Sequence, residues 1–186
     1  MGALYWWFIL LYMARNRYNS LREQAYNINT KECIFISHQK GDLKVAKRIA
    51  DYIIRAGIDV YFDEYDESIN LKDPRSVVDA IKAGIRNSTR MLCILTENSM
   101  HSKWMPWEIG YGYERTTIIG LTGKDIARKV LPEYLQIVPI IKGTRSLNKQ
   151  LAKLIGKDES HLIFERKMFS TTDLRHPLDG ILERQL

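Results

Sequence analysis

The sequence predicts a doubly wound α/β fold, a five-stranded and mostly parallel sheet with helices on both faces. Two observations lead to this fold class. Short apolar runs bounded by polar residues recur between residues 31 and 156, and stretches whose apolar residues recur at helical spacing separate them. Parallel strands need long crossover connections, usually helices, so this alternation is typical of a parallel sheet covered on both faces.

The first three elements follow one another without a long gap. The run CIFIS, residues 33–37, is apolar and ends in polar residues, as a buried strand does. Residues 41–57 carry apolar side chains every three or four positions, and Gly57 ends this expected helix. The run IDVYFD, residues 58–63, is a second strand, and a polar, acidic loop follows it.

The middle of the chain repeats the pattern. Residues 75–87 form a second expected helix, with Asp73 or Pro74 near its start. The run TRMLCILT, residues 89–96, is apolar through its centre and predicts a third strand. A third helix is expected over Lys103–Glu114.

The last elements close the sheet. A fourth strand is expected over residues 116–122 and a fifth over 136–142, whose proline predicts an edge position. Residues 123–135 form a loop or short helix, and residues 146–156 a final helix. Right-handed crossovers then place ligands beyond the carboxyl ends of the strands.

Composition narrows the function classes. The chain has 186 residues, 45% hydrophobic and 27% charged, as in an ordinary soluble globular protein. Its net charge of +6 and pI near 9.3 suit anionic partners such as nucleotides. The basic residues are scattered, however, so we expect no nucleic-acid partner. Cys33 and Cys93 lie in apolar runs without zinc-type spacing, which predicts buried, reduced thiols, no metal and a cytoplasmic protein.

The ends of the chain are assigned separately from the central domain, residues 31–156. Residues 1–30 contain an unbroken apolar run, Ala3–Met13, too short at about 16 Å to cross a bilayer as a helix. It is interpreted as a helix docked on its own domain or on a neighbouring subunit. An interfacial membrane helix and a leader upstream of a start at Met13 stay open as alternatives. Residues 157–186 have weak periodicity and form a C-terminal extension.

The stretch HSKWMPWEIGYGY, residues 101–113, surrounds one carboxylate with aromatic rings. It is either a helix that packs its aromatics into the core or the wall of a pocket that holds a flat ligand against an acid. Trp104 and Glu108 are spaced i,i+4 and share a helix face, assigned to the pocket. Trp107 lies on another face and is expected in the core.

The order of these elements resembles a bacterial TIR (Toll/interleukin-1 receptor) domain. The resemblance rests on a strand ending in FIS, a helix followed by the G-x-x-V-x-x-D-like run GIDVYFD, an apolar strand ending at Thr96, and S-x-W-x-x-x-E in residues 102–108. It covers residues 31–155, and the last element is its most specific part. The chain is also similar to the small TIR subunits of Thoeris-type antiphage systems.

The resemblance implies a flavodoxin-like fold with strand order 2-1-3-4-5 and an enzyme that cleaves NAD+ at the nicotinamide–ribose bond. NAD+ is then a substrate, and no cofactor is implied. The product is an ADP-ribose-derived signal read by a downstream effector. In such enzymes the glutamate of S-x-W-x-x-x-E is catalytic, here Glu108. The other residues assigned to substrate binding are Ser37, His38, Lys40, Asp63, Ser102, Trp104 and Tyr111.

Cleavage of the nicotinamide–ribose bond accounts for a single carboxylate among aromatic side chains. The departing nicotinamide is already cationic, so it needs no general acid, and the ribosyl transition state resembles an oxocarbenium ion. One carboxylate near the ribose can stabilise that charge. Aromatic faces can stack on nicotinamide or adenine and exclude water. Lys40 is the candidate for a phosphate contact.

Alternatives remain at this stage. The family's interaction loop corresponds to residues 63–74, whose acids form either a solvated loop or, less simply, a metal site. In TIR enzymes this loop often packs against a neighbouring protomer, which predicts self-association. A non-enzymatic TIR scaffold is the first rival function, and a nucleoside deoxyribosyltransferase-like enzyme is the second. The sequence does not choose among ADP-ribose, a cyclic form and a conjugate as product.

Overall fold

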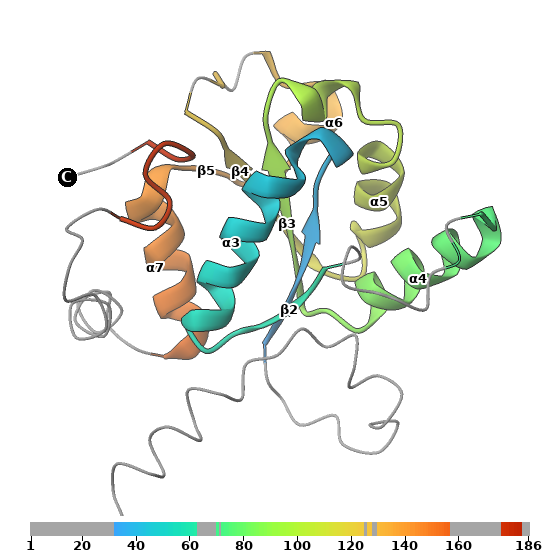
Figure 1. The fold of residues 1–186 in the computed structure, drawn as a ribbon, viewed down its shortest axis with the longest axis horizontal. Coiled ribbons are helices and arrows are strands. Elements are labelled where there is room, and N and C mark those ends of the chain that lie inside the picture. Colours follow the sequence, from blue (N-terminus) through green and yellow to red (C-terminus); the bar gives the residue numbers. More distant parts are fainter. Residues whose placement is uncertain are drawn as a thin grey trace, which may run out of the picture.

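The computed structural model describes residues 32–62, 70, 72–124, 126–127, 130–156 and 176–183. The expected N-terminal helix and most of the acidic loop after the second strand lie outside these residues. The described chain forms one sheet with helices on its two faces (Figure 1).

The sheet confirms the predicted topology. Its five strands run in the order β2-β1-β3-β4-β5, and every neighbouring pair is parallel. The strands are β1 (Cys33–Ser37), β2 (Asp59–Tyr61), β3 (Arg90–Leu95), β4 (Thr117–Thr122) and β5 (Ile140–Lys142). From β1 the chain adds β2 on one side of the sheet and then β3 on the other side. This reversal of strand order places the ligand crevice of the fold at the carboxyl end of β1, beside β3.

The fifth strand is shorter than predicted and begins after its proline. Pro139 has no N–H to donate to a ladder, but its carbonyl accepts a hydrogen bond from Gly120 N–H at 2.9 Å. Pairing then continues with Gly120 opposite Ile140. The predicted edge position of β5 is confirmed.

The helices begin and end at local sequence signals. They are α3 (Leu43–Arg55), α4 (Pro74–Arg86), α5 (Met105–Gly112), α6 (Glu133–Gln136) and α7 (Gly143–Ile155). Asp73 caps α4, since its side chain accepts from Arg75 N–H at 3.0 Å. Gly156 ends α7 in the left-handed conformation, at φ 64°.

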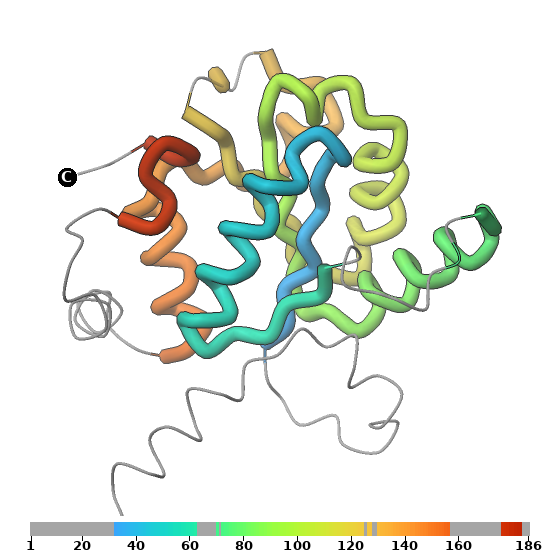
Figure 2. The backbone as a smooth tube through the Cα atoms, in the orientation of Figure 1, coloured from blue at the N-terminus to red at the C-terminus, as the bar shows by residue number. Residues whose placement is uncertain are grey.

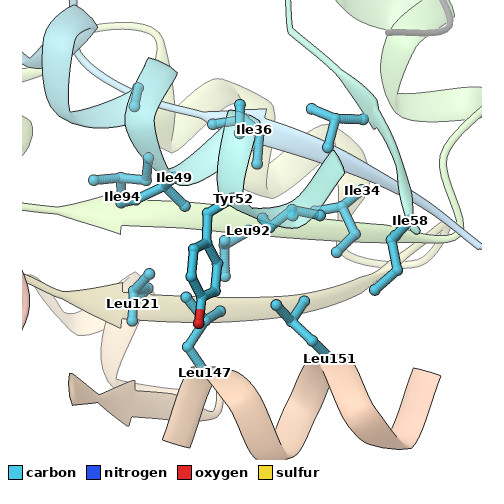
Figure 3. Close-up of a cluster of buried hydrophobic side chains, with 14 of the residues drawn as sticks. Ile34, Ile36, Ile49, Tyr52, Ile58, Leu92, Ile94, Leu121, Leu147 and Leu151 are labelled. Carbon is cyan, nitrogen blue, oxygen red and sulfur yellow. The ribbon is translucent and has the colours of Figure 1, made fainter. Parts of the chain in front are cut away.

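Two apolar layers hold the helices to the sheet. On one face, α3 and α7 pack against the isoleucines and leucines of β1, β3 and β4 (Figure 3). On the other face, α4, α5 and α6 enclose Phe35, Tyr61, Met91 and Leu95. Each fully buried side chain of this size stabilises the fold by about 1.5–3 kcal/mol relative to its exposed state.

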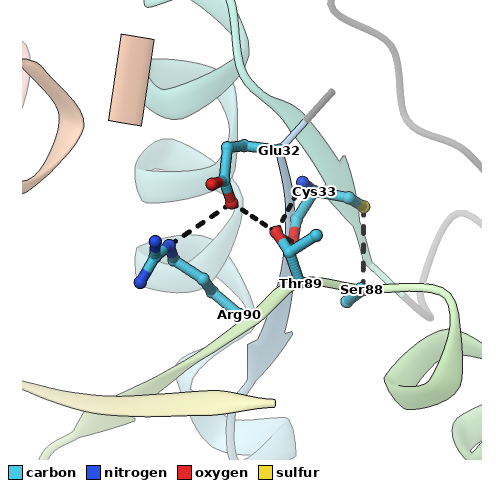
Figure 4. Close-up of polar contacts among 5 residues, drawn as sticks. All are labelled: Glu32, Cys33, Ser88, Thr89 and Arg90. Carbon is cyan, nitrogen blue, oxygen red and sulfur yellow. Dashed lines mark hydrogen bonds and ion pairs between the residues drawn. The ribbon is translucent and has the colours of Figure 1, made fainter. Parts of the chain in front are cut away.

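A polar cluster joins β1 and β3 at their amino ends (Figure 4). Glu32 accepts a hydrogen bond from Thr89 Oγ1 at 2.5 Å, and Arg90 Nε lies 3.3 Å from the same carboxylate oxygen. Thr89 Oγ1 also accepts from Cys33 N–H at 3.1 Å. These contacts set the register in which Ile34 pairs with Arg90.

Residues 176–183 return to the domain and lie beside α7, as Figure 2 shows in red. Leu178 and Leu182 are fully buried in the layer formed by α3 and α7. Tyr52 Oη donates to Asn148 Oδ1 at 2.6 Å and lies 2.9 Å from His176 Nε2. This short piece of the predicted C-terminal extension therefore belongs to the packed core.

Candidate active site at the carboxyl edge of the sheet

Glu108 lies buried at the carboxyl end of β1, although it comes from α5. Ser37, the last residue of β1, donates a hydrogen bond from Oγ to Glu108 Oε2 at 2.5 Å. Both side chains are almost fully buried, at 1% and 5% exposure. A buried carboxylate is costly unless it accepts hydrogen bonds, and the Ser37 hydroxyl supplies one. Glu108 also occupies the first turn of α5, where the helix dipole favours a negative charge.

Cys93 is the third member of this buried group. It pairs with Ser37 in the β1–β3 register, so the two side chains lie on the same face of the sheet. Burial raises the pKa of the Cys93 thiol far above its ordinary value, and the negative charge of Glu108 raises it further, while a hydrogen bond with Ser37 acts in the opposite direction.

The loops after β1 and β3 are joined by Asp42. Asp42 is 5% exposed, and its carboxylate accepts from Thr96 Oγ1 at 2.6 Å and from Asn98 Nδ2 at 2.8 Å. Ser99, also buried, donates from Oγ to Thr96 O and accepts from Thr96 N–H. This Asp42 brace fixes the 3-10 turn Lys40–Asp42 against the 3-10 turn Asn98–His101, which leads into α5.

The remaining polar candidates lie around this edge with different environments. His38 is half-buried, and its ring lies 4.9 Å from that of Phe62, at the end of β2. Lys40 is exposed in the turn before α3. Ser102 Oγ accepts from Met105 N–H at 3.1 Å and so satisfies the first backbone amide of α5. Asp63 lies outside the described residues.

The aromatic residues of α5 are arranged differently from the predicted division by helix face. Trp104 is the N-cap of α5 and is 44% exposed, whereas Glu108 turns inward. Their i,i+4 spacing is real, because Glu108 N–H donates to Trp104 O at 2.9 Å. The helix begins only at Met105, however, so the Trp104 side chain precedes the first turn and reaches solvent.

Trp107 was expected in the core, away from Trp104. It packs only partly against the α4–α5 layer, and its ring meets Trp104 edge to face, with centroids 5.9 Å apart. Tyr111 stacks on Trp107 at 5.7 Å. The three rings form one row along α5, and Tyr111, which the sequence analysis assigned to substrate binding, lies at the end of that row.

Two parts of this edge were absent from the sequence interpretation. Asp42 fell within the expected helix over residues 41–57 and was given no role of its own, although an acid beside Gly41 is typical of a tight, hydrogen-bonded turn. Cys93 was assigned to the core only. The pairing of Ser37 with Cys93 depends on strand register, which a single sequence does not report.

Two further observations concern the described residues alone. They contain no group of three or more His, Cys, Asp and Glu side chains arranged to hold a metal ion. None of the helices in this part of the chain combines the length and apolar character needed to span a bilayer.

The strand order and the edge described above define a flavodoxin-like α/β domain, with a buried carboxylate at the position where this fold binds ligands. A family model described as the TIR domain matches residues 34–155, well over half of the chain. The chain therefore belongs to the TIR domain family.

Two curated relatives share part of the sequence. The chain is 35% identical over 100 residues to a probable 3′ cyclic ADP-D-ribose synthase, ThsB′, of Bacillus cereus (strain MSX-D12), covering 50% of each chain. It is 30% identical over 100 residues to a putative cyclic ADP-D-ribose synthase, TIR2, of Cytobacillus dafuensis, covering 50% of this chain and 26% of that one. The chain thus spans half or less of the length of the relatives it matches.

A solved structure supports the fold. A metazoan TIR-STING receptor from C. gigas, in complex with 2′,3′-cGAMP, superposes with a TM-score of 0.51 at 22% identity. The match covers 67% of this chain and 39% of that receptor chain. At 22% identity, this superposition supports the fold alone.

Proposed function

We propose that this protein cleaves NAD+ at the nicotinamide–ribose bond, with Glu108 as the catalytic residue. The observation that carries the proposal is the Ser37–Glu108 pair, a buried carboxylate held by a hydroxyl at the carboxyl end of β1. Membership of the TIR family supports it, as do two relatives whose names describe cyclic ADP-ribose synthases.

The reaction fits a single carboxylate. The glycosidic C–N bond breaks, its electron pair returns to the pyridinium ring, and neutral nicotinamide departs without a proton. The ribosyl carbon is left with positive charge, which the Glu108 carboxylate stabilises. Ser37 keeps one carboxylate oxygen fixed, so the charge needs little reorganisation when the cation forms.

The product is proposed to be a cyclic ADP-ribose, in which a nucleophile of the same molecule captures the ribosyl carbon. Capture by water would give ADP-ribose instead. The names of both relatives favour the cyclic outcome. The product then serves as a messenger to a separate effector in antiphage defence, as the resemblance to Thoeris-type proteins implies.

Assembly is part of the proposal. Glu108 is 5% exposed, so neighbouring side chains must move before a ribose reaches it. We therefore expect NAD+ cleavage to rise with self-association through TIR surfaces. The proposal also includes a cytoplasmic location and the absence of a cofactor. Its substrate-binding residues are Ser37, His38, Lys40, Asp63, Ser102, Trp104 and Tyr111.

The test incubates the full chain with NAD+ over a range of protein concentrations and measures nicotinamide release. Mass spectrometry separates cyclic ADP-ribose from ADP-ribose, which differ by one water. The proposal expects nicotinamide release that rises with protein concentration and a cyclic product. Glu108→Gln, which keeps the shape and can still accept from Ser37, should fold and lose the activity.

Other outcomes point elsewhere. Intact NAD+ at concentrations where the protein is assembled, together with biological activity that survives Glu108→Gln, would identify a scaffold. Base exchange on deoxynucleosides without loss of NAD+ would identify a deoxyribosyltransferase-like enzyme. ADP-ribose as the sole product would keep the cleavage step and reject cyclisation.

A further inference from the structure

Three aromatic residues form a continuous row along α5 that starts at Trp104, the N-cap of this helix. Trp104 meets the edge of Trp107 with ring centroids 5.9 Å apart and planes at 87°. Trp107 stacks on Tyr111, with centroids 5.7 Å apart and planes at 11°. Both geometries are the favourable ones for aromatic pairs.

The far end of the row is clamped by cations. Arg115, four residues after Tyr111, places its guanidinium 4.3 Å from the Tyr111 ring centroid. Its Nη1 also donates to Tyr111 O at 2.7 Å, which fixes the guanidinium at the end of α5. From α4, Arg86 Nη1 lies 3.4 Å from Tyr111 Oη and Lys82 Nζ lies 6.0 Å from the ring. Side chains of α4 and of the turn after α5 thus contact Tyr111.

The near end of the row is open. Trp104 precedes the first turn of α5 and is 44% exposed, so the body of the domain restrains its indole little. Among the ring contacts of the described residues, Trp104 takes part in one, with Trp107. An exposed side chain without such a contact would exchange among rotamers. The orientation of Trp104 therefore depends on Trp107, and through it on Tyr111 and Arg115.

We propose that Trp107, Tyr111 and Arg115 are positioning residues that hold the exposed Trp104 ring in one orientation at the start of α5, as a fixed wall for a flat substrate ring. This inference rests on the proposed NAD+ cleavage, because it gives the wall a flat substrate ring to bind. Trp104 can then meet the substrate ring without first losing rotamer freedom, so the row contributes to substrate affinity. A row that only packed α5 would contribute to stability and leave affinity unchanged.

The first measurement does not require activity. The chain is labelled with 5-fluorotryptophan, and the Trp104 resonance is assigned by its absence in Trp104→Phe. In Arg115→Gln and Tyr111→Ala we expect this resonance to broaden or shift toward the position of an exposed, freely rotating indole. Tyr113→Ala is the matched control, since Tyr113 is a 52% exposed tyrosine at the end of the same helix. It should leave the resonance in place.

The second measurement is kinetic. Loss of one ring contact should raise KM for NAD+ roughly 3- to 10-fold, with a smaller change in kcat. We expect this of Trp107→Ala and Tyr111→Ala, with partial recovery in Trp107→Phe, which keeps a ring for both neighbours. Arg115→Gln is an exposed change and covers the case in which Trp107→Ala fails to fold. Tyr113→Ala should keep the wild-type KM.

The outcomes separate the two proposals. An unchanged Trp104 resonance in Arg115→Gln and Tyr111→Ala overturns the positioning role. If the variants change the Trp104 resonance but cleave NAD+ with an unchanged KM, the positioning role is also overturned. The proposed cleavage of NAD+ is then unaffected. If wild-type protein does not cleave NAD+ when assembled, the proposed function has failed, and the substrate role of the row falls with it.

Discussion

The two ends of strands β1 and β3 carry comparable polar groups in opposite environments. At the amino end, Glu32 accepts from Thr89 and pairs with Arg90, with side chains about 30% exposed. At the carboxyl end, Glu108 accepts from Ser37, and both are buried. Each end therefore has a carboxylate that accepts from a hydroxyl at 2.5 Å.

The difference lies in what each carboxylate costs the fold. Glu32 is partly hydrated and has a cation beside it, so its ion pair contributes little beyond about 1 kcal/mol. Glu108 has given up most of its hydration for hydrogen bonds and a helix N-terminus. A buried charge that destabilises the fold is typical of a functional site. The carboxyl end of the sheet, and not the amino end, is therefore the candidate active site.

The largest expected effect is on the rate of NAD+ cleavage, and it should differ between substitutions of Glu108 and Glu32. Glu108→Gln should lower kcat for NAD+ cleavage by roughly 100- to 1000-fold, because it removes the charge that stabilises the ribosyl cation. Glu32→Gln makes the same chemical change at the amino end and should leave kcat at the wild-type level. Nicotinamide release by both variants, at matched concentration, makes the comparison. Equal losses in the two variants would mean that Glu108 acts through folding alone.

The next effect concerns the hydroxyls. Ser37→Ala leaves a buried carboxylate oxygen without its donor, which should lower the free energy of unfolding by about 1–3 kcal/mol and slow NAD+ cleavage. Thr89→Ala removes the hydroxyl at the exposed end and should cost about 0.5–1.5 kcal/mol with cleavage retained. Urea unfolding and nicotinamide release measure both. A normal cleavage rate in Ser37→Ala would remove Ser37 from the site.

A third prediction concerns the Asp42 brace, whose hydrogen bonds join the two turns at the carboxyl edge of the sheet. Asp42→Ala leaves the Thr96 hydroxyl and the Asn98 amide without their shared acceptor, and we expect a loss of about 1–3 kcal/mol in the free energy of unfolding. Hydrogen exchange should increase in the turns at 40–42 and 98–101 and remain unchanged at Thr89. An equal increase in hydrogen exchange at Thr89 and in these turns of Asp42→Ala would show that Asp42 stabilises the whole domain and not this edge alone.

The smallest expected effect is a dependence on alkaline pH. The folded-state pKa of Cys93 is raised, so above its ordinary value of about 8.5 the unfolded chain loses the thiol proton while the folded chain keeps it. Stability contributed by the neutral thiol is present below pH 8 and is lost as pH rises. Between pH 7.5 and 9.5 wild type should lose about 1 kcal/mol more of its free energy of unfolding than Cys93→Ala. Parallel curves for the two proteins would contradict this.

The fold was largely predictable, because periodicity reports local structure. The run CIFIS and the helix after it lie where the apolar spacing places them, and the proline of QIVPIIK identified the edge strand. The boundaries of short elements were less predictable. β5 starts only after Pro139, and α5 starts at Met105, since tertiary contacts decide which residues at an element's end keep regular pairing.

The candidate site was predictable in its parts and not in its connections. Glu108 and Ser37 stand out in the sequence, but the hydrogen bond between them joins residues 71 positions apart. The Trp104–Trp107 contact, in contrast, joins positions three residues apart, and helical spacing could have indicated it. Cys93 reaches the Ser37–Glu108 group through strand register. Such contacts depend on three-dimensional placement, which spacing along one chain does not encode.

The returning segment 176–183 separates two meanings of a domain boundary. Similarity to the TIR family ends at residue 155, yet Leu178 and Leu182 are buried under α3 and α7, and Glu183 O accepts from Thr144 N–H at the start of α7. A chain cut where the homology stops would expose the apolar surface that these two leucines cover. The region that matches the family model is therefore shorter than the region that forms the complete core.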